Sequence, residues 1–173
     1  LGLDLSETND NTSVAMVAVD ADNNILADSF AFIPEGRIDE KSASEKVNYR
    51  ELVRGDKVIA CGDRVIDYSV VEDFILSIEK KYNVQIQAVG YDRWNALSTA
   101  QKLDNEGINM VEIRQHSAVL HPPTKLLKEK ILNKEFMYEK NPLLEINFQN
   151  IPIKLSTMFV KILNNIPSIL LRI

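Results

Sequence analysis

Three runs of apolar residues open the chain, and polar turns separate them. They cover residues 1–6 (LGLDLS), 13–20 (SVAMVAVD) and 25–33 (ILADSFAFI). The second run is almost entirely apolar and rich in valine, which is typical of a buried strand. The stretch DADNN at residues 20–24 is rich in turn-forming residues, and Pro34 follows the third run. The pattern therefore predicts three consecutive antiparallel strands joined by short turns.

Helical and strand patterns alternate along the rest of the chain. Strand–helix–strand crossovers add parallel strands to a sheet. We therefore expect an α/β fold with a mixed central sheet, in which three antiparallel strands are followed by parallel strands, flanked by helices. The further predicted elements are a short helix and loop at 37–56, strands at 57–62, 84–92, 109–115 and 136–138, and helices at 69–82, 95–106, 122–131 and 142–148.

Local signals predict where the helices begin and which faces they bury. Ser69 followed three residues later by Glu72 has the spacing of a capping box. The pair Pro122–Pro123 predicts the first turn of a helix, because proline is favoured there. Asn141 before a proline predicts another helix start. Leu97, with Ala100 and Leu103, predicts the buried face of the helix at 95–106.

Composition narrows the class of protein. The chain has 173 residues, is 45% hydrophobic and 26% charged, and carries a formal net charge of -5. The acidic balance does not favour nucleic acid as a partner, although metal ions and a local basic face allow an acidic protein to hold DNA. The single cysteine, Cys61, excludes an internal disulfide and a cysteine-rich zinc site. We expect an intracellular protein, and the first residue, which is not methionine, suggests a piece of a longer chain.

Two aspartates stand at the ends of predicted strands. Asp4 ends the first strand and Asp92 directly follows the strand at 84–91. If these strands are parallel neighbours, both carboxylates reach the same edge of the sheet, where they repel unless a proton or cation lies between them. Oxygen ligands without histidine or cysteine suit Mg²⁺ or Mn²⁺, and a pair of such ions cleaves phosphodiesters. Helix capping or turn formation is the alternative role of each aspartate.

Four segments in succession resemble a known family. They are the opening LGLDLSETNDNTSVAMVAVD, then VGYDRWNA, then EIRQHSAVLHPPTKLLKEKILNKEF, then NPLLEINFQN. In this order they resemble the C-terminal nuclease domain of the large terminase subunit of tailed bacteriophages. The resemblance covers residues 1–150. The segments GYDRWNA and PTK…NPLL…N are its most specific parts, whereas GLDLS occurs in many folds.

The resemblance implies a ribonuclease H-like fold over residues 1–150 and a metal-dependent endonuclease that cuts concatemeric double-stranded DNA by two-metal-ion hydrolysis. It assigns Asp4 and Asp92 as catalytic ligands of two Mg²⁺ or Mn²⁺ ions. It also implies partners, namely an ATPase domain, the small terminase subunit and the portal, and the bacterial host cytoplasm as location. No GxxxxGK[ST] loop occurs in the sequence, so we expect no ATPase domain in this chain. No membrane partner is expected.

The C-terminal tail departs from the family pattern. The family carries a third metal-binding aspartate there, but residues 151–173 contain no aspartate or glutamate. We interpret the tail as atypical and apolar, of the kind that a change of reading frame after Asn150 would produce. Two ligands predict weaker metal binding and impaired cleavage. Four other acids are possible substitutes. Of Asp63 and Asp67, Asp67 better suits a helix cap, and Glu7 and Asp10 better suit a solvated turn.

Several further residues each have two possible roles. Five cations are candidates for phosphate contacts or for ordinary solvated helix faces: Arg93, Lys102, Arg114, Lys125 and Lys128. His116 and His121 suit a loop better than general-base catalysis. Cys61 suits a buried position. Trp94 suits core packing, with stacking on a base as the alternative.

Two other functions compete with the nuclease. The missing third acid favours a catalytically inactive structural or DNA-docking module of the same fold. A sugar-kinase or actin-like phosphotransferase also begins with a strand, an aspartate and a polar turn, as in DLSETNDNTS. That class needs glycine-rich phosphate loops, and the six glycines of this chain are scattered.

Overall fold

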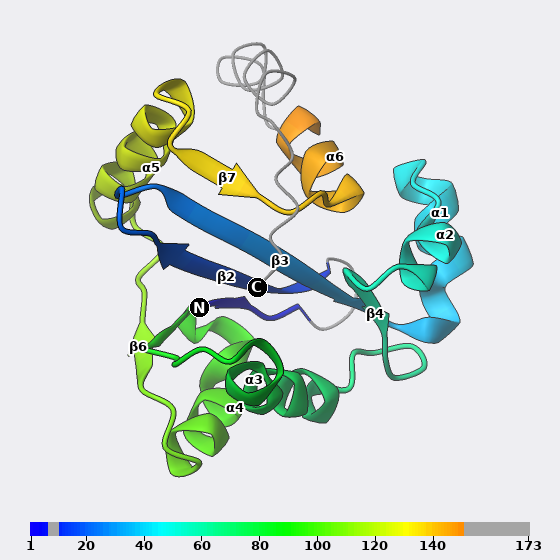
Figure 1. Cartoon of the computed structure of the whole chain (residues 1–173). Helices are drawn as coiled ribbons and strands as arrows, with labels where there is room; N and C mark the ends of the chain where they lie inside the picture. The colour runs from blue at the N-terminus through cyan, green and yellow to red at the C-terminus, as the bar shows by residue number, and fades with distance from the viewer. Residues whose placement is uncertain (7–10, 151–173) are drawn as a thin grey trace. The chain divides into compact units, whose positions relative to one another are not determined.

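The three N-terminal runs form the centre of the sheet. The structure is a computed structural model that describes residues 1–6 and 11–150. Strands β1 (Gly2–Asp4), β2 (Thr12–Val19) and β3 (Ile25–Ile33) are neighbours in the sheet (Figure 1). β1 and β2 are antiparallel, with Gly2 opposite Ala15. The carboxylate of Asp20 accepts hydrogen bonds from the backbone N–H groups of Asp22 and Asn24 at 2.9 and 2.8 Å, which fixes the turn between β2 and β3. The predicted antiparallel start is confirmed.

Every later strand joins the sheet in parallel. β5 (Val89–Tyr91) pairs with β1, and β6 (Met110–Glu112) pairs with β5. β4 (Val58–Ala60) and β7 (Phe136–Tyr138) both pair with β3, at different points along it. The strand order is β4-β3-β2-β1-β5-β6, with β7 on β3. The predicted mixed sheet of antiparallel and then parallel strands is therefore confirmed.

Helices occupy the connections between the parallel strands, and one more helix follows β7. They are the 3₁₀ turn η1 (Glu35–Arg37) and the α-helices α1 (Ile38–Glu45), α2 (Tyr49–Arg54), α3 (Tyr68–Tyr82), α4 (Arg93–Asn105), α5 (Ser117–Leu132) and α6 (Pro142–Asn150).

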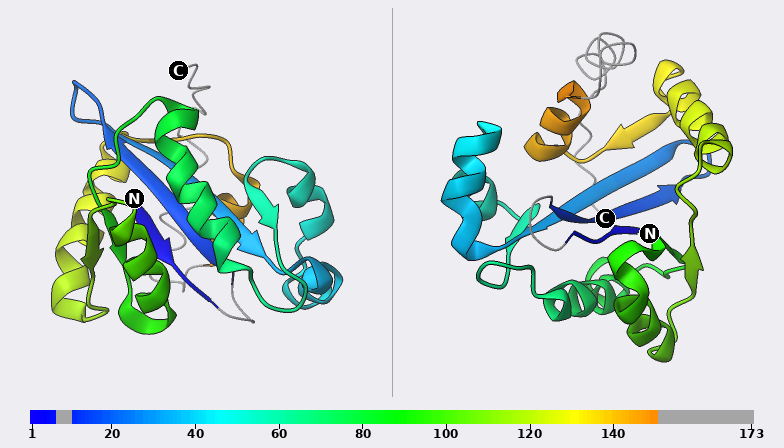
Figure 2. Two further views of the ribbon diagram at one scale, coloured as in Figure 1. Left: turned by 90° about the horizontal axis from the view of Figure 1, so that it is seen from below. Right: turned by 180° about the vertical axis from the view of Figure 1, so that it is seen from behind.

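The chain forms two compact units, which are considered separately. The first contains Leu1–Ala15 and Phe30–Gln115. Its core joins β3 to α3, because the ring of Phe74 lies 4.7 Å from that of Phe30 and 5.4 Å from that of Phe32. Helices α3 and α4 lie side by side (Figure 2). This unit contains β1 and β5, the strands that carry the two aspartates.

Among the described residues, the second unit contains Met16–Ser29 and residues 116–150. Its core is a cluster of Ile131, Phe136 and Tyr138. The side chain of Asn141 caps α6 by accepting from the N–H of Leu144 at 3.1 Å and donates to the carbonyl of Ser29 at 2.8 Å. The predicted helix start at Asn141 is confirmed.

The helix starts predicted at Ser69 and at Pro122 are wrong, whereas the helix cap considered for Asp67 is confirmed. Asp67, not Ser69, caps α3, and its carboxylate accepts from both the backbone N–H and the hydroxyl of Ser69. An earlier acceptor with suitable geometry takes the cap from Ser69, which leaves Glu72 free for another role. Helix α5 begins at Ser117 rather than at Pro122, because Nδ1 of His116 caps it by accepting from the N–H of Ala118 at 3.2 Å.

The strand predicted at 84–92 is shorter than expected, since β5 covers only Val89–Tyr91. The N–H of Val84 donates to the carbonyl of Glu79, and that of Ile86 donates to the carboxylate of Glu79. These groups are therefore bonded to the end of α3 rather than to a neighbouring strand.

Candidate active site

The pairing of β1 with β5 brings Asp4 and Asp92 together. The parallel register aligns Gly2 with Gly90 and Leu3 with Tyr91, so the next aligned positions are Asp4 and Asp92. The backbone of Asp92 is still extended, with φ -82° and ψ 135°, which continues the alignment by one residue. Neighbouring strands lie about 4.8 Å apart, and aligned side chains point to the same face. The two aspartates thus lie side by side at one edge of the sheet.

The alternation of β1 explains how an aspartate is accommodated in an apolar strand. Leu3 and Leu5 are buried, at 4% and 6% exposure, while Asp4 between them is exposed. Because strand side chains alternate between faces, the charge of Asp4 reaches solvent without the cost of burial. On the other side, Asp4 is aligned with Ser13 of β2. Asp4 therefore lies between a hydroxyl and a second carboxylate.

Thr12 fixes the chain directly after Asp4. Its hydroxyl oxygen accepts from the N–H of Ser6 at 2.9 Å and donates to the carbonyl of Ser6 at 3.1 Å. Thr12 is fully buried. These two hydrogen bonds join Ser6, which follows β1, to Thr12, the first residue of β2.

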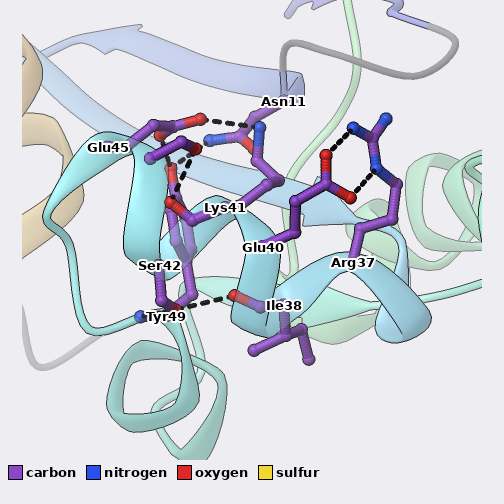
Figure 3. A network of polar contacts seen from close by, with 9 residues as sticks. Asn11, Arg37, Ile38, Glu40, Lys41, Ser42, Glu45 and Tyr49 are labelled. Atoms are coloured by element: carbon purple, nitrogen blue, oxygen red, sulfur yellow. Dashed lines mark hydrogen bonds and ion pairs between the residues drawn. The ribbon is translucent and has the colours of Figure 1, made fainter.

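Buried Tyr49 bonds to Asn11, the residue before Thr12. The hydroxyl of Tyr49 accepts from Nδ2 of Asn11 at 2.8 Å and donates to Glu45 at 2.6 Å (Figure 3). Lys41 pairs with the same Glu45 at 2.8 Å. Burial is the main cause that raises the pKa of Tyr49, and the bond to Glu45 adds to it. The network anchors the start of β2 to α1 and α2.

Asp92 also begins α4. Its Oδ1 accepts from the N–H of Trp94 at 3.3 Å. A carboxylate has two oxygens and about four acceptor sites, so this cap and metal ligation are compatible. The side chain of Asp92 can therefore both cap the helix and bind a metal ion.

An ion pair between two helices orients α4, and sequence reasoning missed it. Glu72 of α3 is 8% exposed and accepts from the hydroxyl of Thr99 at 2.8 Å and from the ammonium of Lys102 at 3.2 and 3.3 Å. Thr99 and Lys102 lie three residues apart, which places them on one face of α4. Lys102, predicted as a DNA contact, is paired with Glu72, although its side chain is 61% exposed.

The remaining predicted cations fall into two groups. Arg93 and Arg114 are exposed and belong to the first unit, with the two aspartates. Lys125 and Lys128 are exposed on α5, in the second unit. Their contact with DNA stays a prediction.

Two of the acids considered as substitute ligands have local structural roles instead. Asp67 caps α3, and Asp63 lies beside Gly36, whose N–H donates to the Asp63 carbonyl. Glu7, Asp10 and the tail at 151–173 lie outside the described residues. Within 1–6 and 11–150, no group of three or more His, Cys, Asp or Glu side chains is arranged to hold a metal ion. Two adjacent carboxylates still offer the oxygen donors that suit Mg²⁺ or Mn²⁺.

Two other expectations have clear outcomes. Cys61 is buried, as predicted. Trp94 is 80% exposed and Leu97 is 48% exposed, so their predicted burial is wrong. The buried face of α4 is instead formed by Ala96, Thr99, Ala100 and Leu103.

Comparisons with known proteins agree on one family. The family model for the terminase large subunit, endonuclease domain, matches residues 1–163. The terminase large subunit of Enterobacteria phage HK97 is 26% identical over 147 residues, which cover 83% of this chain and 28% of that protein. The crystal structure of the HK97 bacteriophage large terminase matches with a TM-score of 0.74 and 24% identity, over 83% of this chain and 30% of that one. The chain thus spans less than a third of the relatives it matches.

The fold likeness supports the predicted architecture, and the family match extends past the predicted domain boundary at residue 150. In the described part of the chain, no helix has both the length and the apolar character needed to cross a membrane.

Proposed function

The chain belongs to the family of terminase large subunit endonuclease domains, and we propose that it is a metal-dependent endonuclease that cuts double-stranded DNA with Asp4 and Asp92 as its metal ligands. The observation that carries the proposal is the parallel register of β1 and β5, because its continuation by one residue would align Asp4 with Asp92. Like charges directly opposite each other on neighbouring strands are unfavourable, and a divalent cation between them removes the repulsion.

Each structural element then has a part in the chemistry. β1 presents Asp4 to solvent, the Thr12–Ser6 pair fixes the chain behind it, and Asp92 starts α4 while retaining acceptor capacity for an ion. Mg²⁺ or Mn²⁺, when bound, supplies activation of water and stabilisation of the leaving oxygen in phosphodiester hydrolysis. Arg93, exposed next to Asp92, is suited to hold a DNA phosphate.

The wider role follows from the family. We propose that the domain cuts concatemeric DNA during packaging, with an ATPase domain, the small terminase subunit and the portal as partners, in the bacterial host cytoplasm. Residues 151–173 contain no acid, so a third ligand is not available from them. We therefore expect weaker metal binding than a three-acid site would have.

Plasmid cleavage in Mn²⁺ tests the proposal. The full chain should nick and linearise supercoiled plasmid, and Asp92→Asn should abolish this activity. Asparagine caps helices about as well as aspartate, so the variant removes the charge and keeps the start of α4. Asp104→Ala is the matched control, because Asp104 is an exposed acid on the same helix. Cleavage that survives both Asp92→Asn and Asp4→Ala would contradict the assignment.

The missing acid also supports a second candidate, an inactive module that docks DNA without cutting it. This candidate predicts binding of a labelled duplex with no cleavage in Mn²⁺ or Mg²⁺. Cleavage by the pure chain that disappears in Asp92→Asn would exclude it.

A further inference from the structure

The start of α4 displays a large aromatic side chain to solvent. Trp94 is 80% exposed, the largest exposed fraction among the bulky hydrophobic side chains of residues 1–6 and 11–150. Burial of apolar surface stabilises a fold, and a tryptophan in this position contributes little of it. The residue also lies two positions after Asp92, so it stands beside the proposed cleavage site.

The local backbone, rather than packing, sets the position of Trp94. Its φ of -66° and ψ of 123° are not helical, and Asn95 has a positive φ of 62° before the regular helix continues with the buried Ala96. The cap from Asp92 uses the backbone N–H of Trp94, a group that any residue except proline supplies. The indole is therefore not needed to form the cap or to fill the core.

The surroundings of Trp94 favour a nucleobase as its partner. On one side of it in the chain is the exposed cation Arg93, and beyond that is Asp92. An aromatic face beside a cation is the combination with which proteins hold bases and phosphates of unpaired nucleic acid. A role in the core of this domain would bury the indole, which the exposure excludes.

Building on the proposed nuclease function, we propose that the indole of Trp94 stacks on a nucleobase that is unpaired or partly unstacked beside the phosphodiester to be cut. Trp94 is then a specificity-determining residue. It favours DNA that is distorted at the cleavage point over regular duplex, while Arg93 holds the adjacent phosphate.

The chain contains a single tryptophan, so its intrinsic fluorescence reports on Trp94 alone. The full chain is titrated in EDTA, which prevents cleavage, with two fluorescein-labelled 20-base-pair duplexes, one fully paired and one with a single unpaired base. Anisotropy of the label measures binding independently. The proposal expects Trp94 emission to be quenched on binding, more strongly and at lower concentration with the unpaired base.

Variants give the second measurement. Trp94→Ala should weaken binding of the duplex with the unpaired base by roughly 5- to 150-fold, the range that loss of one base–aromatic stack produces. Trp94→Phe should keep most of the affinity, because it keeps an aromatic face. Leu97→Ala, an exposed apolar residue on the same helix, is the matched control and should bind as the parent does. Thermal melts should be unchanged in all three.

The outcomes separate this inference from the proposed function. Binding without any change in Trp94 emission, or equal affinity of Trp94→Ala for the duplex with the unpaired base, overturns the stacking role and leaves the nuclease assignment standing. Emission that shifts with protein concentration in the absence of DNA assigns the indole to contact with a second copy, which also overturns it. Absence of both DNA binding and plasmid cleavage rejects both proposals.

Discussion

Asp4 and Asp92 place two like charges on aligned positions of neighbouring strands. In EDTA, Asp92→Asn should raise the free energy of unfolding by about 0.2–1 kcal/mol, since the repulsion between the strands is removed and the cap is kept. Mn²⁺ should raise the melting temperature of the parent chain, because the ion binds only the folded state, and should leave the variant unchanged. Differential scanning fluorimetry with and without Mn²⁺ measures both effects. An equal Mn²⁺ response in the two proteins would show that the ion binds elsewhere.

Two glycines with positive φ differ in their surroundings. Gly62 has a φ of +71°, and an added Cβ would collide with the carbonyl oxygen of Val65, whereas Gly107 has a φ of +90° and open space around it. Replacement by alanine costs about 1–2 kcal/mol at each for the left-handed backbone. Gly62→Ala should cost clearly more because of the collision, which urea unfolding of the two variants will show. Equal costs would mean that the loop around Gly62 adjusts freely.

Between elements, the contact of Glu72 with Thr99 joins α3 to α4, the helix that starts at Asp92. Thr99→Val removes a hydrogen bond to a buried carboxylate and should cost about 1.5–3 kcal/mol. Lys102→Met is the comparison and should cost less, about 0–1 kcal/mol, because the lysine is largely exposed. Chemical denaturation measures both. If Lys102→Met proves the more costly change, the ion pair rather than the hydroxyl joins the helices.

The elements that the sequence predicted well are those whose pattern is local. The runs at 13–20 and 25–33 and the cap at Asn141 depend on neighbouring residues, and all were found. The errors involve choices between competing partners. Asp67 rather than Ser69 caps α3. Glu72 bonds to residues about thirty positions away in α4, a contact that no local pattern specifies. Trp94 was expected in the core, but its backbone and that of Asn95 are not helical and its side chain is exposed.

For the whole molecule, stability should fall in acid. Hydrogen bonds from Arg50 and Arg37 lower the pKa of Asp39 and Glu40, and bonds to Asn24 and Ser69 lower those of Asp20 and Asp67. A lowered carboxyl pKa in the folded state adds stability above the unfolded pKa, and that stability is lost as pH falls through the folded value.

The melting temperature should therefore be nearly constant from about pH 6 to 8 and fall below about pH 5. Asp39→Asn should lower it at neutral pH and reduce the dependence on acid. Thermal melts across this range test the prediction, and a melting temperature that rises on acidification would contradict it.

The candidate site could be predicted because it depends on topology. Once the first strand and the strand before Asp92 were expected to be parallel neighbours, their ends had to meet at one edge. The pattern of apolar and polar residues did not predict the exact alignment of Asp4 with Asp92, because register depends on which backbone groups pair. The pairing of Lys102 with Glu72 and the separate unit that holds Lys125 and Lys128 likewise depend on three-dimensional packing.

The distance in sequence between the two aspartates has a consequence for protein synthesis. Asp4 leaves the ribosome 88 residues before its partner, and the two meet only when β5 has been made and has paired with β1. A growing chain therefore carries half of the carboxylate pair for most of the time that the first unit takes to emerge. The two aspartates are therefore brought side by side only when the β1–β5 pairing is complete.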